Sequence, residues 1–121
     1  MTENPDLPIF LDMQYEPDND FVPGRLAFFC RFEDQGWPGR IIERSLVFQY
    51  FEKEKRLFFR VYPTLVQLPL GEADNLEEAI EQAKNFLRRW LGKDWQFQHK
   101  VAEEIQRLEE EQEAAKRSGK A

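Results

Sequence analysis

The chain has 121 residues, a mass of 14.5 kDa and a formal net charge of −6, with 41% hydrophobic and 33% charged residues. This is the size of one folded domain, and no apolar run approaches the roughly 20 residues that cross a membrane. The single cysteine, Cys30, excludes an intramolecular disulfide and a cysteine-rich zinc motif. The N-terminal residues lack the pattern of a secretory signal, so we expect a cytoplasmic protein.

Charge is distributed unevenly along the chain. Residues 1–24 carry six acidic side chains and no Lys or Arg, whereas residues 25–70 carry eight basic and five acidic side chains. We expect the acidic N-terminal arm to lie near the basic middle of the chain. The pI near 4.9 argues against general nucleic-acid binding, although a local basic surface is compatible with it.

The first half of the chain has the pattern of β-strands. Residues 1–24 contain four prolines, which disfavour a helix, but alternating apolar residues predict a short edge strand over residues 7–15. Residues 25–33, 41–52 and 56–62 are rich in Phe, Ile, Val and Tyr and predict three further strands. Residues 64–70 either extend the last of these strands or form another one.

Two amphipathic helices are predicted to follow the strands. Between residues 74 and 91 apolar residues recur every three or four positions, and Gly92 is a natural stop. A second helix is predicted from residue 94 to about residue 116. Its apolar seam is short for an independent coiled coil but long enough to pair two copies in a homodimer. The seam begins with Phe97, Val101, Ile105 and Leu108.

These elements predict an α+β fold, in which an antiparallel sheet of three to five strands is followed by two C-terminal helices packed on one face. We divide the chain into an acidic, proline-rich arm (residues 1–24), a single α+β domain (residues 25–117) and a disordered tail (residues 118–121). Because side chains alternate along a strand, the predicted core face is almost purely apolar. It comprises Leu26, Phe28, Cys30, Phe32, Leu46, Phe48, Tyr50, Leu57, Phe59 and Val61.

The opposite face of the predicted sheet mixes aromatic residues with arginine, unlike an ordinary solvated face. Either another part of the chain covers it, or a second copy or a partner binds there. This composition is typical of the centre of a protein interface, and it can also stack single-stranded bases. The candidate partner-binding residues are Phe29, Arg31, Phe58, Arg60 and Tyr62, with Trp37 and Arg40 at the rim.

The three tryptophans have different predicted environments. Trp37 lies in a loop of glycines and proline at residues 34–40, and it forms either an exposed recognition tip or a cap folded back onto the core. Trp90 closes the apolar face of the first predicted helix and is expected in the core. Trp95 is expected to pack at the corner between the two helices.

Groups suited to catalysis are scarce. His99 is the only histidine and is expected at the surface, while Cys30 lies on the core face, where cysteine behaves as a small apolar residue. The acidic stretch 18–20 lacks the glycine and the glutamate of a calcium loop and is explained as a turn. No glycine-rich phosphate loop is present. We therefore assign no catalytic residue, no metal site and no cofactor.

One short stretch resembles a known family. Tyr62-Pro63, followed by Asn75-Leu76-Glu77-Glu78-Ala79-Ile80 and Ala83, is similar to the strand-to-helix stretch of small HicB-type antitoxins. The resemblance is confined to residues 62–83 and implies a regulatory protein.

We interpret the chain as a small non-catalytic protein-interaction module, such as an assembly factor, an adaptor or an accessory subunit. It would bind a protein through the aromatic and arginine-bearing face. The alternative is a protein that binds single-stranded RNA or DNA, or an antitoxin-like regulator. A third hypothesis is an enzyme or a small-ligand-binding protein with a pocket between the helices and the sheet, for which the sequence names neither a ligand nor a residue.

Overall fold

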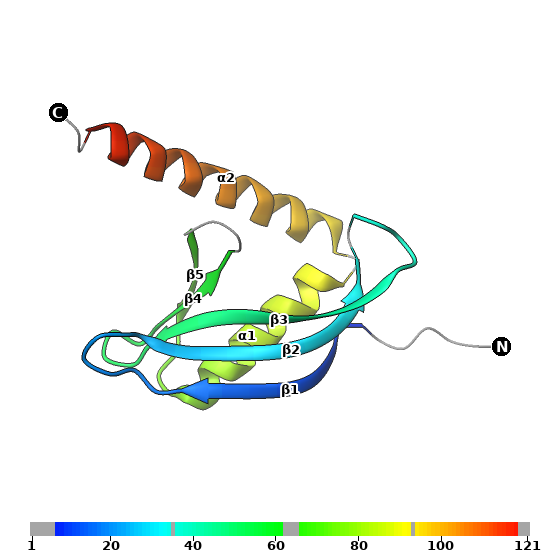
Figure 1. Cartoon of the computed structure of the whole chain (residues 1–121), viewed down its shortest axis with the longest axis horizontal. Coiled ribbons are helices and arrows are strands. Elements are labelled where there is room, and N and C mark those ends of the chain that lie inside the picture. The colour runs from blue at the N-terminus through cyan, green and yellow to red at the C-terminus, as the bar shows by residue number, and fades with distance from the viewer. Residues whose placement is uncertain (1–6, 35, 62–65, 93, 119–121) are drawn as a thin grey trace.

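The computed structural model describes residues 7–34, 36–61, 66–92 and 94–118. Within these residues the chain forms one five-stranded antiparallel sheet followed by two helices, which confirms the predicted α+β fold (Figure 1). The strands neighbour one another in their sequence order. The elements are β1 (Ile9–Glu16), β2 (Gly24–Glu33), β3 (Ile41–Phe51), β4 (Arg56–Arg60), β5 (Gln67–Glu72), α1 (Leu76–Leu91) and α2 (Trp95–Ser118).

The strands agree closely with the predicted segments. β5 is a separate strand that pairs with β4, so the alternative of one extended strand is wrong. The predicted edge strand of the acidic arm is β1, which pairs with β2. There Glu16 lies opposite Arg25, with 3.9 Å between Glu16 Oε1 and Arg25 Nη1. This part of the acidic arm therefore does lie beside the basic middle of the chain.

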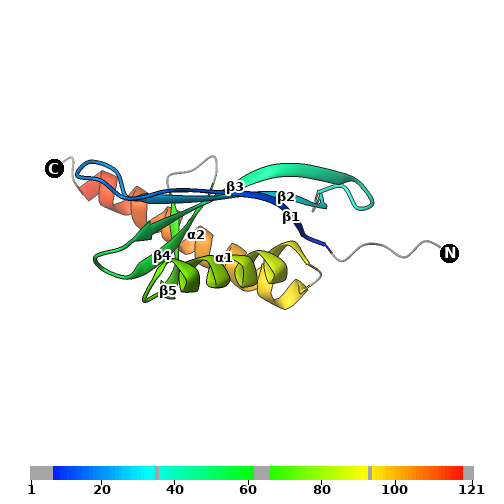
Figure 2. The ribbon, with the colours of Figure 1, turned by 90° about the horizontal axis from the view of Figure 1, so that it is seen from below.

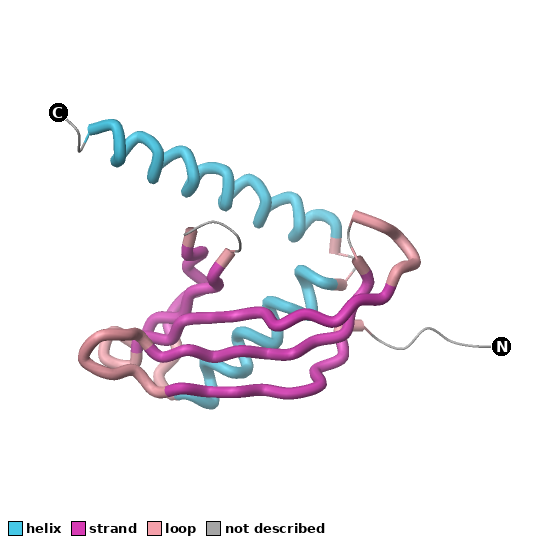
Figure 3. The backbone as a smooth tube through the Cα atoms, viewed as in Figure 1, coloured by secondary structure: helices cyan, strands magenta, loops and turns pink. Residues whose placement is uncertain are grey.

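The helices form a layer on one side of the sheet. α1 crosses behind the strands in the view of Figure 1, and the same arrangement is visible in the backbone trace (Figure 3). Seen from below, α1 lies under the sheet, with β4 and β5 curving down beside it (Figure 2). Among the described elements, α2 contacts α1 and β5 only, so it extends the helical layer past the β5 edge.

A cluster of aromatic rings joins the sheet to α1. Phe48 of β3 is fully buried, and its ring centroid lies 5.7 Å from that of Phe28 and 5.0 Å from that of Phe59. The ring of Phe86 of α1 packs on β3 and β4, with its centroid 6.2 Å from that of Phe48 and 5.1 Å from that of Phe59. Trp90 extends the cluster at 5.1 Å from Phe59, as predicted. The buried face of the sheet is the face that the alternation of apolar residues predicted.

Hydrogen bonds cap the start of α1 and connect the residue before the cap region to the sheet. Asn75 is the N-cap residue and accepts a hydrogen bond from the Glu78 N–H at 2.9 Å, while the Glu78 carboxylate accepts one from the Asp74 N–H at 2.8 Å. This pair is a variant of the capping box, because Glu78 accepts from the residue before the N-cap rather than from the N-cap itself. One residue earlier, the Ala73 carbonyl accepts a hydrogen bond from the buried Tyr50 hydroxyl at 2.6 Å. Burial raises the pKa of Tyr50, which keeps this hydroxyl a donor.

Trp95 does not pack between the helices. It is 71% exposed, so the prediction of a tryptophan at the inter-helix corner is wrong. The reason lies in the cap of α2, where the Asp94 carboxylate accepts a hydrogen bond from the Phe97 N–H at 3.1 Å. This cap fixes the rotation of the helix so that Phe97 faces the core, and Trp95, about 200° away around the helix, faces outward.

We expect Phe48→Ala to lower the free energy of unfolding by about 3–5 kcal/mol, because it removes a ring packed on three others. Phe29→Ala, on the opposite face, should cost only about 1 kcal/mol, because its ring is already partly in water. Urea denaturation measures both values. Equal costs for the two variants would mean that the opposite face is covered in the folded protein.

Candidate functional site

The face of the sheet opposite α1 carries most of the candidate partner-binding residues, and we call it the open face. No helix of the described chain contacts it, because α1 packs on the core face and α2 lies beyond β5. The strand register places its central residues in cross-strand rows. These are Arg25, Ala27, Phe29 and Arg31 of β2, Glu43, Ser45, Val47 and Gln49 of β3, and Arg56, Phe58 and Arg60 of β4.

The apolar part of the open face is a narrow strip that includes Ala27, Phe29, Val47, Phe51 and Phe58, and the rings of Phe51 and Phe58 pack edge to face with their centroids 5.3 Å apart. Ala27 and Val47 are paired across β2 and β3 and are buried by their neighbours. Phe29 lies one row away on β2 and is 38% exposed, while Phe58 lies on the other side of Val47 and is half-buried. A shallow hollow of about 230 Å³ opens beside Phe29. It is lined by Asp12, Met13, Gln14, Ala27, Phe29 and Ser45.

The structure spreads the predicted contact residues along the strands. Phe29 lies opposite Ser45, and Phe58 lies opposite Gln49, four residues further along β3. At about 3.4 Å per residue, this offset is about 14 Å along the strand direction. Phe29 and Phe58 therefore do not touch each other. Tyr62 is outside the described residues.

Charge on the open face is more balanced than the arginines suggested. Arg31 donates to Glu43 across the β2–β3 pair, with 2.7 Å between Arg31 Nη2 and Glu43 Oε2. The sequence prediction placed Arg31 on this face but missed Glu43, although alternation along β3 puts Glu43 on the same face as Ser45. On β4, Arg56 lies over the ring of Phe58, with its Cζ 5.2 Å from the ring centroid. The arginines thus flank the aromatic rings, and two of them, Arg31 and Arg25, have acidic partners in Glu43 and Glu16.

The loop between β2 and β3 presents Trp37 to solvent. Trp37 is 66% exposed, which selects the exposed tip over the folded-back cap. The loop is ordered by its own hydrogen bonds: Asp34 N–H donates to the Arg40 carbonyl at 2.8 Å, and Gly39 N–H donates to the Glu33 carboxylate at 3.0 Å. Gly39 has φ +89°, a conformation that favours glycine. Trp37 therefore lies in a loop that is held by hydrogen bonds, and Arg40 in the same loop is also exposed.

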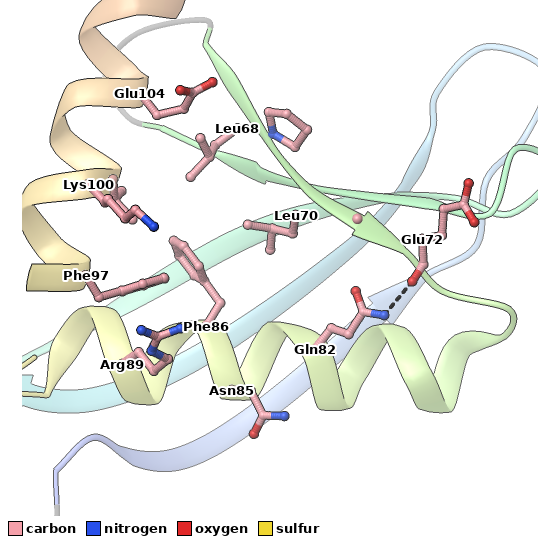
Figure 4. Close-up of a pocket in the computed structure, with 13 residues that line it drawn as sticks. Leu68, Leu70, Glu72, Gln82, Asn85, Phe86, Arg89, Phe97, Lys100 and Glu104 are labelled. Atoms are coloured by element: carbon pink, nitrogen blue, oxygen red, sulfur yellow. Dashed lines mark hydrogen bonds between the residues drawn. The ribbon is translucent and has the colours of Figure 1, made fainter.

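A second candidate site is a groove between β5, α1 and α2 (Figure 4), in the region between helices and sheet for which the sequence named no residue. We call it the β5 groove, and its volume is about 690 Å³. Phe86 of α1 and Phe97 of α2 meet at its base, with ring centroids 5.6 Å apart. Its apolar lining comprises Leu68, Leu70, Phe86, Phe97 and Val101, and its polar lining includes Glu72, Gln82, Asn85, Arg89, Lys100 and Glu104.

Most charged groups of the β5 groove are already paired. The Arg89 guanidinium lies over the Phe97 ring, 4.1 Å from its centroid, and its Nη2 is 3.2 Å from Asp94 Oδ2. Arg107 donates hydrogen bonds to Glu104 and thereby lowers the pKa of that carboxyl, so Glu104 is ionised and paired with Arg107, which also pairs with Glu111. Lys100 differs, because its ammonium makes no ion pair or hydrogen bond with any described residue.

The described residues bring no catalytic group together with another. Ser45 lies on the open face, His99 is on the exposed side of α2, and Cys30 is buried in the core. The imidazole of His99 instead contacts Glu103 one turn along α2, at 2.7 Å. Within the described ranges, no group of three His, Cys, Asp or Glu side chains converges as metal ligands. No helix in this part of the chain is long and apolar enough to span a membrane.

No protein-family model matches the chain, and no curated protein or solved structure is significantly similar to it. The likeness of residues 62–83 to HicB-type antitoxins stays a prediction. The open face, the loop that carries Trp37 and the β5 groove are the candidate binding surfaces of the described chain.

We expect Cys30 to be unreactive in the native protein. Its thiol is fully buried, and burial raises the pKa of Cys30 to about 11, which lowers the fraction of reactive thiolate about 100-fold relative to a free thiol. Labelling with a chromogenic disulfide reagent near pH 8 should be at least that much slower in buffer than in denaturing urea. Fast labelling in buffer would contradict the buried position of Cys30.

Proposed function

We propose that the protein is a non-catalytic protein-interaction module that binds its partner through the open face and the adjoining Trp37 loop. The observation that carries this proposal is the one-sided packing of the sheet. α1 packs on the core face and α2 lies beyond the β5 edge, so no described helix covers the open face, where Phe29 is partly exposed and Phe58 is half-buried under Arg56. A partly exposed aromatic strip framed by arginine has the composition of an interface centre.

The geometry of the open face favours a protein partner over a nucleic acid. A groove for single strands combines a continuous positive surface with stacking rings. Here Glu43 neutralises Arg31, and Asp12 and Glu16 of β1 lie on the same face beside β2. Phe29 is also too far along the strands from Phe58 to stack successive bases with it, and the neighbouring rings of Phe51 and Phe58 pack edge to face on each other. These features support an assembly factor, an adaptor or an accessory subunit.

The contact can be tested with a photo-crosslinker attached at one position of the open face. Ser45→Cys places a thiol beside Phe29, and the buried Cys30 leaves it as the only reactive cysteine. Glu110→Cys, on the exposed far half of α2, is the matched control. We expect a protein from nuclease-treated lysate to be crosslinked from position 45 and not from position 110. Crosslinking from both positions, or from neither, would contradict the proposal.

The affinity of the crosslinked partner should depend on one aromatic side chain. Phe29→Ala should raise the dissociation constant at least about tenfold, the effect typical of a residue at the centre of an interface. Phe21→Ala is the control, because Phe21 is exposed in the β1–β2 connection and is not on the open face. An unchanged affinity for the Phe29 variant would place the contact elsewhere. Crosslinking from position 45 that is seen only in lysate without nuclease would instead favour the nucleic-acid alternative.

A further inference from the structure

The floor of the β5 groove is apolar, and its depth comes from three elements. β5 contributes Leu68 and Leu70, α1 contributes Phe86, and α2 contributes Phe97 and Val101. Leu70 is the extra residue of a β-bulge, where the β4–β5 register shifts, and its side chain points toward Phe86 (Figure 4). The volume of about 690 Å³ lies within the roughly 300–1,000 Å³ of small-molecule sites.

One end of this groove carries an unpaired cation. The Lys100 ammonium points from α2 into the groove (Figure 4), whereas the nearby Arg89 guanidinium is paired with Asp94 and lies on the Phe97 ring. The two acidic lining residues are placed differently. Glu104 is paired with Arg107, and Glu72 is at the other end of the groove, with its carboxylate turned away from α2. An anionic group at the Lys100 end would therefore meet an unpaired cation without facing an unpaired carboxylate.

The free edge of β5 is poorly suited to pairing with another strand. Pro69 has no N–H to donate, and the bulge at Leu70 and Gly71 interrupts the regular spacing of the backbone groups. The carbonyl of Glu72 is already occupied by the Gln82 side chain, which donates a hydrogen bond to it. These features disfavour an extended peptide and leave the apolar floor and the cationic end as the means of recognition.

We infer that the β5 groove binds a small amphipathic carboxylate, with its aliphatic chain against Leu70, Phe86 and Phe97 and its head group beside Lys100. Each part of this ligand meets a matching part of the site. The chain would remove the partly exposed Leu70 and Phe97 from water. The head group would supply the partner that the Lys100 ammonium lacks among the described residues. This site is separate from the open face, so neither proposal depends on the other.

The test compares three probes of equal chain length and different charge: octanoate, octanol and octylamine, each below micelle-forming concentrations. Amide chemical shifts of the full chain report both the site and the dissociation constant. We expect octanoate to shift amides of β5, α1 and the first half of α2, and to bind about fivefold more tightly than octanol, the gain of one partly exposed ion pair. Octylamine should bind most weakly.

Two matched variants assign the charge preference. Lys100→Gln should reduce the affinity for octanoate to that for octanol and leave octanol unchanged. Lys84→Gln is the control, because Lys84 lies on α1 over the Phe10 ring and does not line the groove. Equal binding of all three probes would indicate a purely apolar contact surface and overturn the proposal. Shifts outside the groove, no binding of octanoate, or an unaltered Lys100 variant would overturn it as well.

Discussion

The packing of Phe48 against Phe86 is the contact on which the rest of the structure depends. It joins the middle of the sheet to the middle of α1, and Phe28, Phe59 and Trp90 complete the ring cluster around it. Burying these rings gives the sheet one dry face and fixes α1 beneath it. The chain contains only two helices in its described part, and both are used on this side. The open face is thus a direct consequence of where the aromatic core formed.

The elements and the core face could be predicted from the sequence because they depend on local patterns. Alternation along residues 25–33 and the three-four spacing after Asn75 are encoded within single segments. β5 was harder to assign, since Pro69 and the positive φ of Gly71 (+137°) both interrupt a strand pattern. The orientation of Trp95 also escaped prediction, because it follows from the Asp94 cap rather than from hydrophobicity.

The candidate sites were predictable to different degrees for a related reason. Alternation along each strand is enough to assign a residue to the open face, so the face of Phe29, Arg31 and Phe58, and that of Arg60, could be predicted. The distances between these residues depend on how the strands pair, which the sequence does not specify. The β5 groove combines Leu70, Phe86 and Lys100, which are far apart in the sequence. Its existence depends on the angle between α1 and α2 and on the bulge in β5. No local sequence pattern encodes that angle, so the groove became visible only in three dimensions.

The far half of α2 has a consequence for how the protein melts. Residues 109–117 are exposed on every side, and their helix is supported by pairs such as Arg107–Glu111 and Glu113–Arg117 within α2 itself. Such pairs add only a few tenths of a kcal/mol each. Helix in this segment is therefore lost gradually from its free end on warming, as in an isolated peptide. Far-ultraviolet ellipticity should begin to fall while the near-ultraviolet signal of the buried aromatic cluster is still unchanged.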